Sequence, residues 1–164
     1  KDLEATWTKK HGKNYHGYKN HEKVDAGSKL IDHYVVTTAS VSDGTMAWEL
    51  LDAREKGQEL HADKGYAWAE VRRGVRKARM KDRILKQARR NKPLTRKDKE
   101  RNTELSRTRA RAEHVCGSMN KQLHGLRVRG IGLIRATFRV GLTNLCYNIL
   151  RSLYLIPTST VGSV

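Results

Sequence analysis

The chain has 164 residues, a length that suits one domain, and 37% of them are hydrophobic, enough for a core of ordinary size. Its 34 Lys and Arg residues outnumber its 17 Asp and Glu residues, which gives a formal net charge of +17. The longest uncharged run near the C-terminus, residues 140–150, is shorter than the roughly 20 apolar residues of a membrane-spanning helix. Two cysteines without a Cys-x-x-Cys pair exclude a disulfide scaffold and favour a reduced, cytoplasmic protein.

The positive charge is concentrated in residues 71–121, which hold nineteen Lys and Arg and five Asp and Glu. A block of this kind attracts polyanions through counterion release and long-range electrostatics. A solvated, highly charged helical face is the structural alternative. Because the net charge is so large on so short a chain, we expect nucleic acid as the partner.

The first part of the chain predicts a loop, a hairpin and a helix. Residues 1–14 are polar and predict a loop. Residues 15–25 and 29–39 are rich in strand formers and flank an Ala-Gly-Ser turn, which predicts a β-hairpin. Asp43 is expected to cap the N-terminus of a helix that ends near Gly57.

Strand-forming and helix-forming segments alternate through the rest of the chain. We expect strands over residues 58–63 and 83–85, helices over 66–78, 103–122 and 131–155, and a polar surface excursion over 88–101. This order predicts an α/β fold with a mixed sheet flanked by helices. Residues 1–155 form the expected domain and residues 156–164 a tail.

Two acidic residues are candidates for chemistry. Asp63 follows a short apolar stretch and precedes Lys64 and Gly65, so we expect it at the carboxyl end of a buried strand, where α/β sheets bind ligands. A turn or cap role is the alternative. Glu113 lies fifty positions further on, one helical turn after Arg109, at the border of an apolar and a basic helix face. A solvent-facing position is the alternative for this Glu.

Together the two carboxylates suit a hard cation such as Mg²⁺, which binds carboxylate, water and phosphate oxygens. Two carboxylates are too few for a two-metal site, so at least one more acid is needed. Asp25 and Asp43 are the available candidates, although a hairpin turn and a helix cap explain them structurally. No Walker loop and no Gly-x-Gly-x-x-Gly run is present in the sequence.

Several short motifs follow one another in order along residues 1–155. They are Lys1-Asp2-x-Glu4-Ala5-x-Trp7-x-Lys9-Lys10, Tyr15-x-Gly17-Tyr18-Lys19-x-His21 with Val24-Asp25, Val36-Thr37-x-Ala39-x-Val41-x-Asp43, Ala62-Asp63-Lys64-Gly65-Tyr66, Arg109-x-Arg111-x-Glu113-His114-Val115, and Gly141-Leu142-x-Asn144-Leu145-x-Tyr147-Asn148. In this order and spacing, they make the chain resemble the DDE-type transposases of bacterial insertion sequences. The catalytic domain of that family is ribonuclease H-like.

The resemblance implies DNA transposition by metal-dependent strand cleavage and strand transfer at transposon ends. Asp63 and Glu113 would be the second and third acids of the catalytic triad and ligands of Mg²⁺, with Mn²⁺ as the alternative ion. The residues expected to contact DNA phosphates are Arg109, Arg111, Lys64 and Lys121. The implied partners are double-stranded DNA, as transposon ends and target, and a second subunit in a homodimer of the complete enzyme. The implied location is the bacterial cytoplasm, in association with the nucleoid.

The sequence departs from the family pattern at Ser106 and Asn120, where the family signature has tyrosine and lysine. The family's first acid lies on a central strand upstream of residues 1–10, and no apolar strand ending in Asp precedes Tyr15. We therefore expect a C-terminal fragment that lacks the first, central strand of a ribonuclease H-like sheet and is inactive alone. The alternatives are a non-enzymatic basic nucleic-acid-binding module and a decayed transposase remnant.

Overall fold

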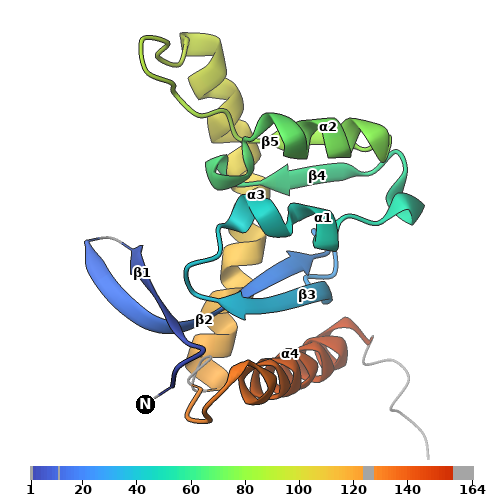
Figure 1. Ribbon diagram of the computed structural model, residues 1–164. Coiled ribbons are helices and arrows are strands. Elements are labelled where there is room, and N and C mark those ends of the chain that lie inside the picture. The colour runs from blue at the N-terminus through green and yellow to red at the C-terminus, as the bar shows by residue number, and fades with distance from the viewer. Residues whose placement is uncertain (1, 11, 124–127, 157–164) are drawn as a thin grey trace, which may run out of the picture.

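The computed structural model describes residues 2–10, 12–123 and 128–156, which form two small β-sheets crossed by one long helix, α3 (Figure 1). This mixture of strands and helices confirms the α/β class predicted from the sequence. None of the helices in the described ranges is long and apolar enough to cross a membrane.

The first sheet is antiparallel, with β1 (Thr6–Lys10), β2 (Lys13–Val24) and β3 (Ile31–Thr38) in that spatial order. β2 is long, and its first part pairs with β1 while its second part pairs with β3. The β2–β3 pair confirms the predicted hairpin. The predicted N-terminal loop is wrong, because residues 6–10 form a strand on β2 although their lysines and threonines show no apolar alternation.

A segment of short helical turns follows β3: η1 (Asp43–Met46), α1 (Ala47–Leu50) and η2 (Ala53–Glu55). The prediction of one helix reaching Gly57 is wrong, because the backbone becomes extended at Leu51, with φ −82° and ψ 133°. The predicted cap is also wrong. Ser42 precedes the first turn, and the Asp43 carboxylate instead pairs with the Lys19 ammonium group.

The second sheet is parallel and consists of β4 (Glu59–Ala62) and β5 (Lys81–Ile84), joined by η3 (Lys64–Tyr66) and α2 (Ala69–Lys77). Both predicted strands are confirmed. On α2, Val71 and Val75 lie one turn apart and are buried against Ile84 of β5, as the helical spacing predicts.

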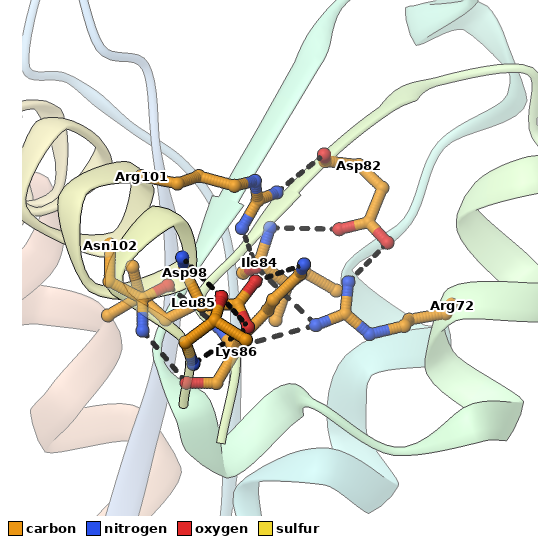
Figure 2. A network of polar contacts seen from close by, with 9 residues as sticks. Arg72, Asp82, Ile84, Leu85, Lys86, Asp98, Arg101 and Asn102 are labelled. Atoms are coloured by element: carbon orange, nitrogen blue, oxygen red, sulfur yellow. Dashed lines mark hydrogen bonds and ion pairs between the residues drawn. The ribbon is translucent and has the colours of Figure 1, made fainter. Parts of the chain in front are cut away.

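Helix α3 (Arg96–Gln122) begins seven residues before the predicted position, inside the expected surface excursion. Thr95 and Asp98 form a reciprocal capping box at its start. Near this end, the Arg101 guanidinium donates to the carbonyls of Ile84 and Asp82, at 3.1 and 3.3 Å, and so attaches α3 to β5 (Figure 2). The other end of α3 buries Val115 and Met119 in a hydrophobic cluster with Ile31 and Tyr147.

Helix α4 (Leu133–Leu155) confirms the predicted C-terminal helix and packs on β3 of the first sheet. Its Asn148 side chain accepts from the Ile31 amide at 2.9 Å and donates to the Ile31 carbonyl at 2.8 Å. Only one face of α4 is buried. Several apolar residues on its other side are exposed: Ile134, Phe138, Leu145, Ile149 and Leu153.

The two sheets do not pair with each other. β2 and β4 face each other and run in opposite directions, as the arrows in Figure 1 show. β1 pairs with residues 13–17 of β2, and no described strand pairs with residues 18–24 on that same edge. β4 pairs with β5 along one edge, and no described strand pairs with its other edge. The space between them is the location of the candidate site.

Candidate functional site

A cavity of about 940 Å³ lies between the two sheets. Its walls are the second part of β2 and the whole of β4, with side chains of α1 on one side and of α3 on the other. Both Asp63 and Glu113 line this cavity, so residues fifty positions apart in the sequence border one space.

Asp63 directly follows β4, at the carboxyl end of a strand as the sequence predicts. Its Oδ1 accepts from the Lys64 amide at 2.7 Å and caps the short turn η3. Asp63 therefore also has the alternative role of a cap, which uses only one of its carboxylate oxygens. Its half-buried side chain still lines the cavity.

Glu113 lies on α3, and its side chain is 61% exposed. Arg109, one turn earlier and 28% exposed, forms an ion pair with it, in which Nη1 lies 2.8 Å from Glu113 Oε1. This pair holds the carboxylate on the side of α3 that borders the cavity.

Carboxylate oxygens are the ligands that hard cations prefer in proteins. Within the ranges that the structure describes, no group of three His, Cys, Asp or Glu side chains is close enough to hold a metal ion. Asp25 lines the cavity, but hydrogen bonds from the Ser28 hydroxyl and amide lower the pKa of its carboxyl and tie it to the hairpin turn. Asp43 faces Lys19 and His21 instead. Neither of the two candidates from the sequence completes the site.

The predicted phosphate-binding residues occupy different positions. Lys64 is exposed beside Asp63, and Arg109 lines the cavity. Arg111 donates to the Ala26 carbonyl at 3.0 Å, which places it beside the β2–β3 turn. Lys121 is exposed near the end of α3, about 12 Å along the helix from Glu113 at 1.5 Å per residue.

The cavity also contains a residue that the sequence did not single out. Glu22, on β2, is partly buried, and this burial raises the pKa of its carboxyl to about 7. It accepts hydrogen bonds from Asn20 Nδ2 and, at 3.6 Å, from Cys116 Sγ. No signal in the sequence could have found it, because His21 and Lys23 beside it are polar as well.

Polar atoms without partners gather around the same space. Of the described side-chain atoms that are buried and lack a hydrogen-bond partner, four belong to residues that line the cavity. They are Asn20 Oδ1, Glu55 Oε2, His61 Nδ1 and Arg109 Nε. Buried polar groups in folded proteins are nearly always hydrogen-bonded, so this concentration distinguishes the surroundings of the cavity from an ordinary core.

Comparison with known proteins places the chain in a family. A family model described as a transposase DDE domain matches residues 2–149. The chain is also 34% identical, over 152 residues, to the transposase for insertion sequence element IS1106 of Neisseria meningitidis serogroup B, covering 93% of this chain and 52% of that protein. It therefore spans about half the length of this relative. No solved structure gives a significant match. The chain belongs to the family of transposase DDE domains.

Proposed function

We propose that this chain is the C-terminal part of a transposase catalytic domain that, once complete, cuts DNA at transposon ends and joins those ends to a target. The observation that carries the proposal is that Asp63 and Glu113 border one cavity in a chain of the DDE family. Double-stranded DNA is the proposed substrate, which agrees with the net charge of +17.

The proposed arrangement is ribonuclease H-like, with one strand between β2 and β4 that the described residues do not supply. Such a strand would run antiparallel to β2 and parallel to β4, and it would use the edges of both, which are unpaired in the described structure. Without it, the chain is proposed to be catalytically inactive.

Asp63 and Glu113 are the proposed metal ligands, with Mg²⁺ as the ion and Mn²⁺ as its substitute. The metal would activate a nucleophile and stabilise the leaving oxygen at a phosphodiester. A third acid would have to come from the segment that fills the cavity, because no third described acid joins the pair. Lys64, Arg109, Arg111 and Lys121 would bind DNA phosphates beside this site.

A longer form of the protein, carrying the residues encoded upstream of Lys1, tests the proposal. With Mg²⁺ and DNA containing the element's ends, it should cleave, whereas the 164-residue chain should only bind. Asp63→Asn in the longer form should abolish cleavage and keep DNA affinity, because the asparagine Oδ1 still accepts from the Lys64 amide. Glu70→Gln, an exposed change on α2, is the matched control.

Each outcome assigns a function. If the longer form binds DNA without cleaving it and Asp63→Asn changes nothing, the chain is a non-enzymatic DNA-binding module. If neither form binds DNA or melts cooperatively, the chain is a decayed remnant. Sedimentation of the longer form on paired DNA ends tests the proposed homodimer.

The proposed strand has a separate test. Ala112 lines the cavity from α3, so Ala112→Leu should fill part of the space and raise the melting temperature of the 164-residue chain. In the longer form, the same leucine should lower the melting temperature by colliding with the strand. Thr103→Leu, at an exposed position on the same helix, is the control. Stabilisation of both forms would contradict the proposed strand.

A further inference from the structure

The first hairpin of the chain forms an arm that extends from the body of the molecule. β1 pairs with residues 13–17 of β2, and Figure 1 shows this ribbon (dark blue) extending away from the helices and from the second sheet. The base of the arm is anchored. The Tyr18 hydroxyl donates to Asp2 Oδ2 at 2.8 Å, and the Ser40 amide donates to Thr6 Oγ1 at 2.8 Å. The arm is therefore a fixed projection of the first sheet.

The strand register gives each face of the arm the same two kinds of side chain. Trp7 lies opposite His16, with ring centroids 5.0 Å apart, and Lys9 lies two residues further along the same face. On the other face Tyr15 lies opposite Thr8, and the next pair outward is Lys10 with Lys13. Each face thus carries one large aromatic ring and at least one lysine.

These side chains are unusually exposed for their type. Trp7 is 66% exposed and Tyr15 is 51% exposed, although both rings would be expected to bury most of their surface. No acidic residue occurs from Ala5 to His21, so the lysines of the arm have no carboxylate beside them in the sequence. Exposed rings among unpaired cations are typical of a surface that binds nucleic acid.

We propose that the β1–β2 arm enters the major groove of duplex DNA, where its lysines contact phosphates and the ring on the face turned to the bases, Trp7 or Tyr15, contacts base edges. This site rests on the proposed function for its ligand, DNA, and adds a contact outside the cavity. The major groove, about 12 Å wide, admits a two-stranded β-ribbon. A platform that stacks single-stranded bases presents its rings side by side on one face, whereas the two rings of this arm lie on opposite faces.

The affinity test compares the arm with matched positions elsewhere. Using the 164-residue chain and a 25-base-pair duplex, the double variant Trp7→Ala/Tyr15→Ala should weaken binding by about tenfold in fluorescence anisotropy. Phe138→Ala, at a ring that is 73% exposed on α4, should leave affinity unchanged. The change Lys10→Gln/Lys13→Gln should reduce the slope of log affinity against log salt by about 1.8, since each phosphate contact contributes roughly 0.9. The exposed pair Lys56→Gln/Lys77→Gln is its control.

A crosslinking test reports the groove directly. 5-Iododeoxyuridine carries its iodine in the major groove, where thymine has its methyl group, so irradiation of the substituted duplex should crosslink the DNA to Trp7 or Tyr15. Peptide mapping identifies the residue, and Trp7→Ala/Tyr15→Ala should remove the crosslink.

The outcomes separate the arm from the proposed function. If the wild-type chain binds the duplex and the arm variants behave like their controls, the arm proposal fails while the proposed function stands. If the aromatic variant weakens binding to single-stranded DNA more than to the duplex, the groove contact is wrong. If the wild-type 164-residue chain binds no DNA, the arm proposal fails, and the longer form then decides the proposed function.

Discussion

Arg109 Nη1 and Glu113 Oε1 lie 2.8 Å apart across one turn of α3, at the border of the cavity between the two sheets. The Glu113 carboxylate is well exposed, so solvent screens the pair, and such helical pairs contribute little to stability. We therefore expect the Arg109–Glu113 pair to orient the Glu113 carboxylate rather than to stabilise the fold.

Arg109→Gln should change the free energy of unfolding by no more than about 0.5 kcal/mol. The loss of the ion pair is partly offset, because the substitution also removes the buried Arg109 Nε that lacks a partner in the described structure. Urea denaturation of the 164-residue chain measures this change. Arg96→Gln, which breaks the exposed pair with Glu100 on the same helix, is the control. A loss above about 1.5 kcal/mol would give the pair a structural role.

Glu22 predicts a dependence of stability on pH. Its folded-state pKa of about 7 is above the ordinary value of 4.5, so between these values the folded chain binds more protons than the unfolded chain. The contribution of Glu22 to stability is therefore greatest below pH 4.5 and falls as the pH rises to about 7. Glu22→Gln removes this loss, and at pH 8 it should stabilise the chain by roughly 1–3 kcal/mol.

Thermal denaturation of both chains from pH 4 to pH 8 checks this expectation. The two stability curves should converge at low pH and separate as the pH rises. Glu49→Gln, an exposed change on α1, should leave the difference from wild type constant with pH. A constant difference for Glu22→Gln as well would show that burial does not control its titration.

The attachment of α3 to β5 should be sensitive to Arg101. Arg101→Gln removes the donors to the Ile84 and Asp82 carbonyls, and it should lower the free energy of unfolding by about 1–3 kcal/mol. Arg101→Lys should be intermediate, because an ammonium group does not reproduce the planar fork of a guanidinium. Urea denaturation measures both, with the exposed Arg107→Gln as control. Equal losses for positions 101 and 107 would contradict the attachment seen in Figure 2.

The side chain of Asn148 should be equally important for α4. Asn148→Ala leaves the Ile31 amide and carbonyl without their partners and should cost about 2 kcal/mol. Asn148→Asp keeps an acceptor for the amide but places a carboxylate oxygen next to the Ile31 carbonyl, so it should not restore stability. Hydrogen exchange at the Ile31 amide locates the effect, and Asn120→Ala on the exposed side of α3 is the control. Unchanged protection of Ile31 in Asn148→Ala would refute the role.

The elements with clear local signals could be predicted from the sequence. The β2–β3 hairpin has tyrosines and Val24 before its turn and a run of β-branched residues after it, and β4 has apolar residues before Asp63. β1 lacks such a signal, because it is held by backbone pairing with β2 and leaves both faces exposed. The early turns of α3 were missed because their Lys and Arg residues have the composition of a surface loop. The helix starts at the capping box formed by Thr95 and Asp98.

The site could be predicted only in part, because sequence spacing does not determine how separate elements pack. The sequence indicated Asp63 and Glu113, and both line one cavity, while their role as metal ligands stays a prediction. Glu22 was missed because its burial depends on α3 crossing β2, which brings Cys116 to its carboxylate. The exposed apolar side of α4 was likewise hidden, since a helix rich in apolar residues suggests burial on all sides.

Helix α3 spans both sheets, and its 27 residues correspond to a length of about 40 Å. One end is fastened to β5 through Arg101, and the other is embedded beside Ile31 and Tyr147. Asp63 follows β4, which pairs with β5 and so belongs to the sheet that Arg101 attaches to α3. Glu113 lies on α3 between the two attached ends. A slight bend of α3 would change the distance between the Asp63 and Glu113 carboxylates without breaking a strand pairing. The stiffness of this one helix therefore determines how constant that distance is.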